Sequence, residues 1–159
     1  VRFPIWFEPV ADGDTPMREA LQAAREVIAD WVKTHPSAFP PIIIHITDGE
    51  PTTGDPEPVA EAIHQLRTND GNVLLFNLHI GSGAGATVIF PSSEAEVPQD
   101  EAARLLFRMS SRLPDFMIEA GPSLGYPLAP GARGYGYNVD MVGTVEFLNI
   151  GTQPTNLAR

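Results

Sequence analysis

Residues 40–55 of the chain read PIIIHITDGEPTTGDP. Residues 42–44 are three consecutive isoleucines, so both faces of an extended strand would be apolar here. Strands of this kind occur in parallel sheets that helices cover on both faces. The apolar run ends abruptly at Asp48. The segment therefore predicts a buried parallel strand that ends in a turn rich in hydroxyls and carboxylates.

Helix and strand patterns flank this segment. Residues 14–35 carry apolar side chains at 4-3-4-3 spacing, which predicts an amphipathic helix, and residues 3–10 (FPIWFEPV) predict a short or edge strand. Residues 55–70 predict a second helix and residues 72–80 (NVLLFNLHI) a second buried strand. Strand, helix and strand in this order predict a right-handed parallel crossover. The fold class is α/β: a doubly wound, mostly parallel sheet with helices on both faces.

The remaining sequence is less regular. Residues 98–113 predict a helix, residues 115–120 a further turn, and the Gly- and Pro-rich residues 121–137 a loop. Asn138 is predicted to cap a last helix. The residues expected on its inward face are Met141, Val142, Val145 and Leu148.

Composition limits the possible functions. With 159 residues, 43% of them hydrophobic, the chain predicts one domain over residues 1–159. A net charge of −10 disfavours nucleic acid and anionic membranes, which bind clustered Lys and Arg. The chain has no cysteine, which excludes a disulfide, a thiolate nucleophile and a sulfur-bound zinc. There is no spanning apolar run or leader pattern, so we expect a cytoplasmic protein with no membrane partner.

Two polar segments are predicted to meet at the carboxyl edge of the sheet, where open α/β folds bind their ligands. Asp48 follows the isoleucine strand, and Thr15 begins the first helix just after a predicted strand. Taken singly, Asp48 is typical of a turn and Thr15 of a helix cap. Together they offer a carboxylate and a hydroxyl, hard oxygen ligands suited to Mg²⁺, Mn²⁺ or Ca²⁺.

These segments resemble the motifs of a known family. Residues 13–21 (GDTPMREAL) resemble the threonine motif, and residues 42–52 (IIIHITDGEPT) the aspartate motif, of von Willebrand factor A-type (vWA) domains with a metal-ion-dependent adhesion site. Residues 104–111 and 131–152 are similar to the end of bacterial members. The resemblance implies a cation held by three loops at the top of the sheet. An acidic side chain of a protein partner would complete its coordination shell.

The resemblance also implies a role for individual residues. Thr15 would be the hydroxyl ligand, and Asp48 would bind the metal directly or through water. Gly49 would keep the turn compact. The residues expected in the second shell or at the partner are Asp14, Gly49, Glu50 and Thr52. The function implied is a cation-dependent protein-binding module, not an enzyme, with Mg²⁺ as the first candidate and Mn²⁺ or Ca²⁺ as the others.

One family motif is missing. No aspartate of this chain begins the Asp-x-Ser-x-Ser pattern, which supplies three further ligands from the first, central strand. In such sheets that strand lies beside the one that ends at Asp48. Without it, residues 42–46 would present an apolar edge prone to association. We therefore expect an upstream or separate segment to supply the central strand.

Other interpretations of the same residues remain open. Asp48 could accept a phosphoryl group, as in receiver domains or haloacid-dehalogenase-like phosphatases, although the further acidic pair and lysine of receivers are not evident. The chain could also be a vWA scaffold that no longer binds metal. Residues 81–86 fit G-x-G-x-x-A, but the extended TVIFP follows where a dinucleotide site needs a helix. His45 and His79 lie within apolar strands and are expected to be packed and hydrogen-bonded.

Overall fold

The computed structural model describes residues 13–81 and 85–152, so the strand expected at residues 3–10 and residues 82–84 of the glycine segment lie outside the described residues. The α/β fold class is confirmed. Helices and strands alternate along the chain, and the main sheet is mixed but mostly parallel.

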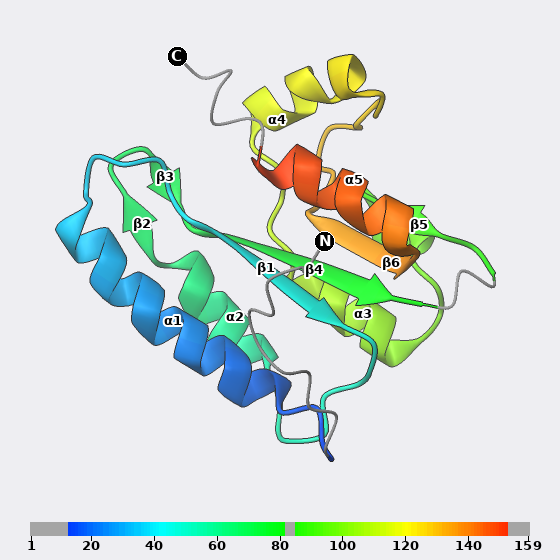
Figure 1. Cartoon of the computed structure of the whole chain (residues 1–159), viewed down its shortest axis with the longest axis horizontal. Helices are drawn as coiled ribbons and strands as arrows, with labels where there is room; N and C mark the ends of the chain where they lie inside the picture. Colours follow the sequence, from blue (N-terminus) through cyan, green and yellow to red (C-terminus); the bar gives the residue numbers. More distant parts are fainter. Residues whose placement is uncertain (1–12, 82–84, 153–159) are drawn as a thin grey trace, which may run out of the picture.

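The main sheet has the strand order β1-β4-β6-β5. Its members are β1 (Ile42–Thr47), β4 (Leu74–Ile80), β6 (Tyr135–Val139) and β5 (Val88–Ile89). β1 runs parallel to β4 with Ile42 opposite Leu74 and Thr47 opposite His79, and β4 runs parallel to β6. β5 is antiparallel to β6. In the described part of the chain β1 pairs only with β4, so it is an edge strand (Figure 1).

Helices lie on both faces of this sheet (Figure 1). One face carries α1 (Met17–Thr34), α2 (Glu57–His64) and α3 (Glu101–Met109), and the other carries α4 (Asp115–Ala120) and α5 (Met141–Thr152). Shorter elements connect them: the hairpin of β2 (Arg67–Thr68) and β3 (Gly71–Asn72), and the 3₁₀ turns η1 (Glu94–Glu96) and η2 (Gly121–Leu124).

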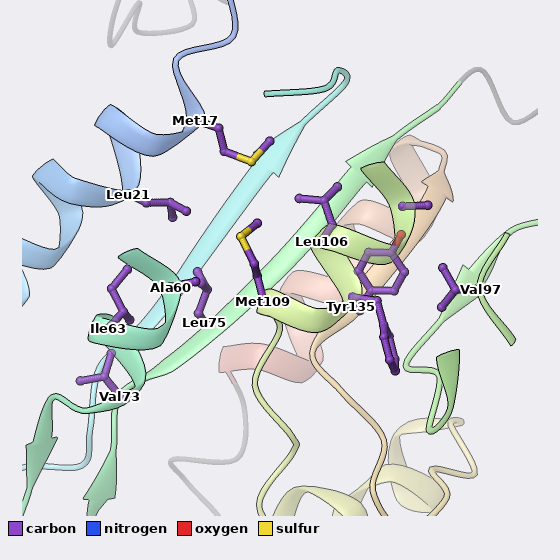
Figure 2. Packing of buried hydrophobic residues seen from close by; sticks show 12 residues of the cluster. Met17, Leu21, Ala60, Ile63, Val73, Leu75, Val97, Leu106, Met109 and Tyr135 are labelled. Carbon is purple, nitrogen blue, oxygen red and sulfur yellow. The ribbon is translucent and has the colours of Figure 1, made fainter. Parts of the chain in front are cut away.

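Successive side chains of β4 point to opposite faces of the sheet and join two separate core layers. Leu75 packs with α1, α2 and α3, in the cluster drawn in Figure 2 together with Met17, Leu106 and Tyr135. Phe76 faces the opposite layer with α4 and α5. Burying a side chain of this size stabilises the fold by about 1.5–3 kcal/mol, so β4 holds both helical layers to one sheet.

The predicted bounds of α1, β1 and β4 are confirmed to within a few residues. The expected burial of both faces of β1 is wrong, because β1 is an edge strand in the described residues: Ile42, Ile43 and Ile44 are half-buried and Ile46 is exposed. α1 begins after Pro16, buries Met17 and Leu21, and ends at Thr34; the ring Nδ1 of the next residue, His35, lies 3.0 Å from the carbonyl oxygen of Trp31. The helix expected over residues 55–70 is shorter, because the hairpin β2–β3 begins three residues after α2 ends.

The loop expected over residues 121–137 is wrong at its end, where β6 enters the sheet. Two glycines explain both the strand and the error. A Cβ at Gly134 would lie 2.1 Å from Cδ1 of Phe76, and one at Gly136 would lie 2.5 Å from Cδ1 of Leu78. The strand needs glycine so that side chains of β4 can press against its backbone, and glycine in a sequence is more typical of a loop.

The inward face expected for the last helix is also wrong. Met141, Val142 and Val145 are 78%, 66% and 61% exposed, whereas Phe147 is buried. The helix approaches the sheet through Gly143, where a Cβ would lie 2.7 Å from Cγ1 of Val139. Asn138 belongs to β6 and does not cap the helix. Asp140 takes that place, since its Oδ1 accepts a hydrogen bond of 2.8 Å from the Gly143 amide.

Candidate functional site

The two segments singled out in the sequence meet at the carboxyl end of β1. The Thr52 amide donates to the Thr15 carbonyl oxygen at 3.1 Å, and the Thr15 amide donates to Oγ1 of Thr52 at 2.9 Å. These reciprocal bonds fasten the start of α1 to the loop that follows β1. A Cβ on Gly49 would lie 3.3 Å from Oγ1 of Thr15, so the hydroxyl lies against the turn that contains Asp48.

The two predicted ligands have free oxygen atoms. In the part of the chain that the structure describes, neither Oγ1 of Thr15 nor the carboxylate of Asp48 takes part in a hydrogen bond or an ion pair. Asp48 is exposed, and Thr15 is half-buried. A hydroxyl and a carboxylate at neighbouring positions are therefore both open to a ligand from solvent.

The surrounding residues shape the turn. The Thr47 hydroxyl donates to the Gly49 carbonyl oxygen at 3.1 Å and accepts from the Gly49 amide at 3.2 Å, which closes a tight turn directly around Asp48. Thr52 is occupied in fastening Thr15, as described above. Asp14 and Glu50 are exposed. Of the four residues expected in the second shell or at the partner, Thr52 and Gly49 thus contact the Thr15 segment.

A cleft of about 180 Å³ opens beside Asp48. Its polar lining consists of Asp48, Glu50, His79, Asp100 and Tyr137. The last three were not predicted from the sequence. The rule that ligands gather at the carboxyl edge of the sheet applies to His79 from the predicted strand at residues 72–80, and to Tyr137 once β6 is recognised.

The lining residues are held by contacts within the fold. The rings of His79 and Tyr137 stack with centroids 4.8 Å apart, and Nδ1 of His79 accepts from the Asn138 amide at 3.4 Å. Asp100 caps α3 by accepting a bond of 2.8 Å from the Ala103 amide. These bonds fix one wall of the cleft, while Asp48 and Glu50 form the other.

His45 lies on β1, three residues before Asp48, and is packed, as expected. Its Nδ1 lies 2.9 Å from Oδ1 of Asn77 on the neighbouring strand. Burial lowers the pKa of His45, and the hydrogen bond with Asn77 opposes that shift only in part. The ring is therefore a neutral structural group, because burial disfavours the charged form.

The described residues contain no complete set of metal ligands. Within residues 13–81 and 85–152, no three Asp, Glu, His or Cys side chains are grouped so that they could hold a metal ion. Thr15 and Asp48 give two oxygen ligands. Mg²⁺ commonly keeps several waters and binds one or two protein carboxylates, so such a pair fits it in chemistry and needs further ligands from elsewhere.

Comparisons with models of protein families, with curated proteins and with solved structures gave no match. Among the described helices, none combines the length and the apolar character needed to cross a membrane. The function therefore has to be argued from the site itself.

Proposed function

We propose that the chain is the larger part of a vWA-type domain that binds a protein partner through a divalent cation, with Mg²⁺ as the first candidate. One observation carries this proposal. The GDTP segment is hydrogen-bonded to Thr52, in the loop that follows TDGE, and lies against Gly49, while Oγ1 of Thr15 and the Asp48 carboxylate are unpartnered in the described residues. A cation held there would keep a coordination position for an acidic side chain of the partner.

The proposal includes a further strand beside β1, supplied by an upstream or separate segment. Within residues 13–81 and 85–152, the outer edge of β1 pairs with no other strand, and such an edge forms a template for another strand. Ile46 is 45% exposed on this strand, and Ile80 at the end of β4 is 38% exposed. A strand added here would cover apolar surface and end next to Asp48, where it could add ligands to the cation.

The proposed module has no catalytic residue. Asp48 has no lysine near it in the described fold, since Lys33 lies in the last turn of α1, at the other end of that helix from Thr15. We therefore do not favour phosphoryl transfer at Asp48.

Thermal denaturation of the full chain in Mg²⁺ or in EDTA tests the proposal. A ligand that binds only the folded state raises Tm by mass action, so we expect Mg²⁺ to raise Tm. Thr15→Ala and Asp48→Ala should abolish the rise. Asp30→Ala is the matched control, because its carboxylate lies on α1 with 83% of the side chain exposed. Ionic strength is matched with NaCl, since Mg²⁺ also screens a net charge of −10.

An equal rise in all variants would mean general screening and would contradict the proposal. No rise in the unmodified chain would leave the vWA scaffold without metal as the better description. Acid-labile phosphate on Asp48 after treatment with a small phosphodonor would favour the phosphoryl-transfer alternative.

A further inference from the structure

A second cleft, of about 450 Å³, lies at the amino end of the sheet, away from Asp48. It is formed by α2, the start of β4, the end of α3 and the segment before β6. Arg108, Arg112 and Arg133 line it. These are three of only ten Lys and Arg in a chain with twenty Asp and Glu. A group of arginines in so acidic a protein calls for a physical explanation.

The three arginines differ in their partners. Arg108 is neutralised by two carboxylates, at 3.1 Å from Glu57 and 3.1 Å from Glu101. Arg112 and Arg133 have no carboxylate within ion-pair distance in the described residues. Two guanidinium groups of the cleft therefore have no ion-pair partner in the described residues, although the charge of Glu94 acts on Arg133 from a greater distance and opposes the lowering of its pKa.

The backbone places these two arginines directly opposite each other. Arg112 and Arg133 form an antiparallel bridge, and residues paired in this way extend their side chains to the same side. Like charges in directly opposite positions repel and destabilise the pairing. Burial, and next the charge of Arg112, lower the pKa of Arg133. An anion bound between the two side chains would attract both guanidinium groups and would offset their mutual repulsion.

Arg133 is held in a fixed orientation. Its Nη1 donates to the carbonyl oxygens of Arg108 at 3.1 Å and Ser110 at 2.6 Å, and its guanidinium carbon lies 5.0 Å from the centre of the Phe107 ring. Nε and Nη2 make no hydrogen bond in the described part of the chain. That free edge is the pair of parallel donors that binds a carboxylate or phosphate in bidentate fashion.

The other titratable residues of the cleft adjust its charge. Burial and the nearby charge of Arg133 lower the pKa of His64, so its ring adds no charge at neutral pH. Glu61 also lines the cleft and opposes an incoming anion. Arg112 is exposed and Arg133 half-buried, so both are reachable from solvent.

We propose that this cleft binds a small oxyanionic ligand, through a phosphate or carboxylate group held between Arg112 and Arg133. The ligand would receive two parallel hydrogen bonds from the fixed guanidinium of Arg133 and a charge-assisted bond from the more exposed side chain of Arg112. This site is independent of the cation site proposed at the carboxyl end.

Titration of the full chain with inorganic phosphate and, separately, with malonate tests the site by two-dimensional NMR at low ionic strength. We expect saturable shifts at the amides of residues 108–112 and 133–134. A charge-assisted hydrogen bond contributes enough that Arg112→Gln should weaken binding about tenfold or more. Arg18→Gln is the matched control, because it removes an exposed arginine at the start of α1, at the other end of the sheet. Glu61→Gln should strengthen binding.

The two anions distinguish the ligand classes. Saturation by phosphate alone identifies a phosphate site, and saturation by malonate identifies a carboxylate site. Arg112→Gln leaves Arg133 and its packing in place, so a folded variant is expected. The proposal is overturned if neither anion gives saturable shifts in the cleft, or if Arg112→Gln binds as well as Arg18→Gln.

Discussion

The two ends of the central strand β4 present opposite chemistry. The carboxyl end meets the carboxylates of Asp48, Glu50 and Asp100, whereas the amino end meets the guanidinium groups of Arg112 and Arg133. β4 has seven residues, so the ends are separated by about 20 Å, which exceeds the screening length of about 8 Å in physiological salt. The two proposed sites would therefore bind ligands of opposite charge independently on one sheet.

A substitution in the middle of the sheet should cause the largest loss of stability. Gly134→Ala would place a Cβ 2.1 Å from Cδ1 of Phe76 and should cost about 3 kcal/mol of stability. Neither the Phe76 ring nor the backbone at residue 134 can shift freely in a packed core. Urea denaturation measures the loss. If the clash is the cause, the loss should be smaller when Phe76→Leu is already present. An equal loss in both backgrounds would contradict this explanation of β6.

A substitution at one end of the sheet should change ligand binding at that end only. Asp48→Asn should abolish the Tm rise caused by Mg²⁺ and leave phosphate affinity unchanged. Arg112→Gln should weaken phosphate binding about tenfold and leave the Mg²⁺ response unchanged, since screening isolates the ends. Calorimetric titration and thermal denaturation measure both responses in both variants. If either variant changes both responses, the two ends are coupled, which would contradict the independence of the two proposed sites.

Acid should destabilise the fold through one histidine near each end. Burial lowers the pKa of His45, and burial with the charge of Arg133 lowers that of His64. An unfolded histidine has a pKa of about 6.5, so the unfolded chain binds more protons as the pH falls below that value. Protonation of the two histidines in the unfolded chain therefore lowers the free energy of unfolding as the pH falls below about 6.5.

The variants His45→Gln and His64→Gln isolate these contributions. Between about pH 7.5 and about pH 5, each variant should lose less stability than the unmodified chain, as measured by urea denaturation. Comparing losses in this way removes the effect of protonating the many carboxylates, which is common to all three proteins. A loss of equal size in all of them would contradict the role assigned to the two rings.

The smallest expected effect concerns the turn after β1. In Gly49→Ala the new Cβ would lie 3.3 Å from Oγ1 of Thr15, so the hydroxyl must move by a few tenths of an ångström. Stability should change by less than about 1 kcal/mol, as for most surface substitutions. The Tm rise caused by Mg²⁺ should nevertheless become smaller. An unchanged Mg²⁺ response would indicate that Thr15 does not contact the ion.

Local patterns were sufficient to predict α1, β1 and β4, but not the hairpin of β2 and β3. α1 has a continuous apolar stripe and a proline at its start, and β1 and β4 are long apolar runs, so each element is specified by its own residues. β6 and the buried face of α5 depend instead on the space next to Phe76 and Val139. Glycine at these close contacts carries no apolar signal, which is why sequence reasoning placed a loop and the wrong helix face there.

The same contrast applies to the sites. Thr15 and Asp48 could be predicted to meet because Asp48 follows β1 and Thr15 precedes α1 after a predicted strand, and a general rule says ligands gather at such positions. Arg112 and Arg133 could not be predicted, since they are paired by a short bridge between two irregular segments. Asp100 and Tyr137 required the positions of α3 and β6 before they could be assigned to the cleft beside Asp48.

The most direct measurement is the paramagnetic broadening of amide resonances by substoichiometric Mn²⁺ in the full chain. Mn²⁺ shares the oxygen preference of Mg²⁺ and broadens signals only near the bound ion. We predict that the amides of Thr15, Asp48, Gly49, Glu50 and Thr52 broaden first, and that Thr15→Ala and Asp48→Ala remove the effect. Broadening spread over exposed carboxylates such as Asp30 and Asp70, with no preference for Asp48, would contradict a cation site at the carboxyl end of the sheet.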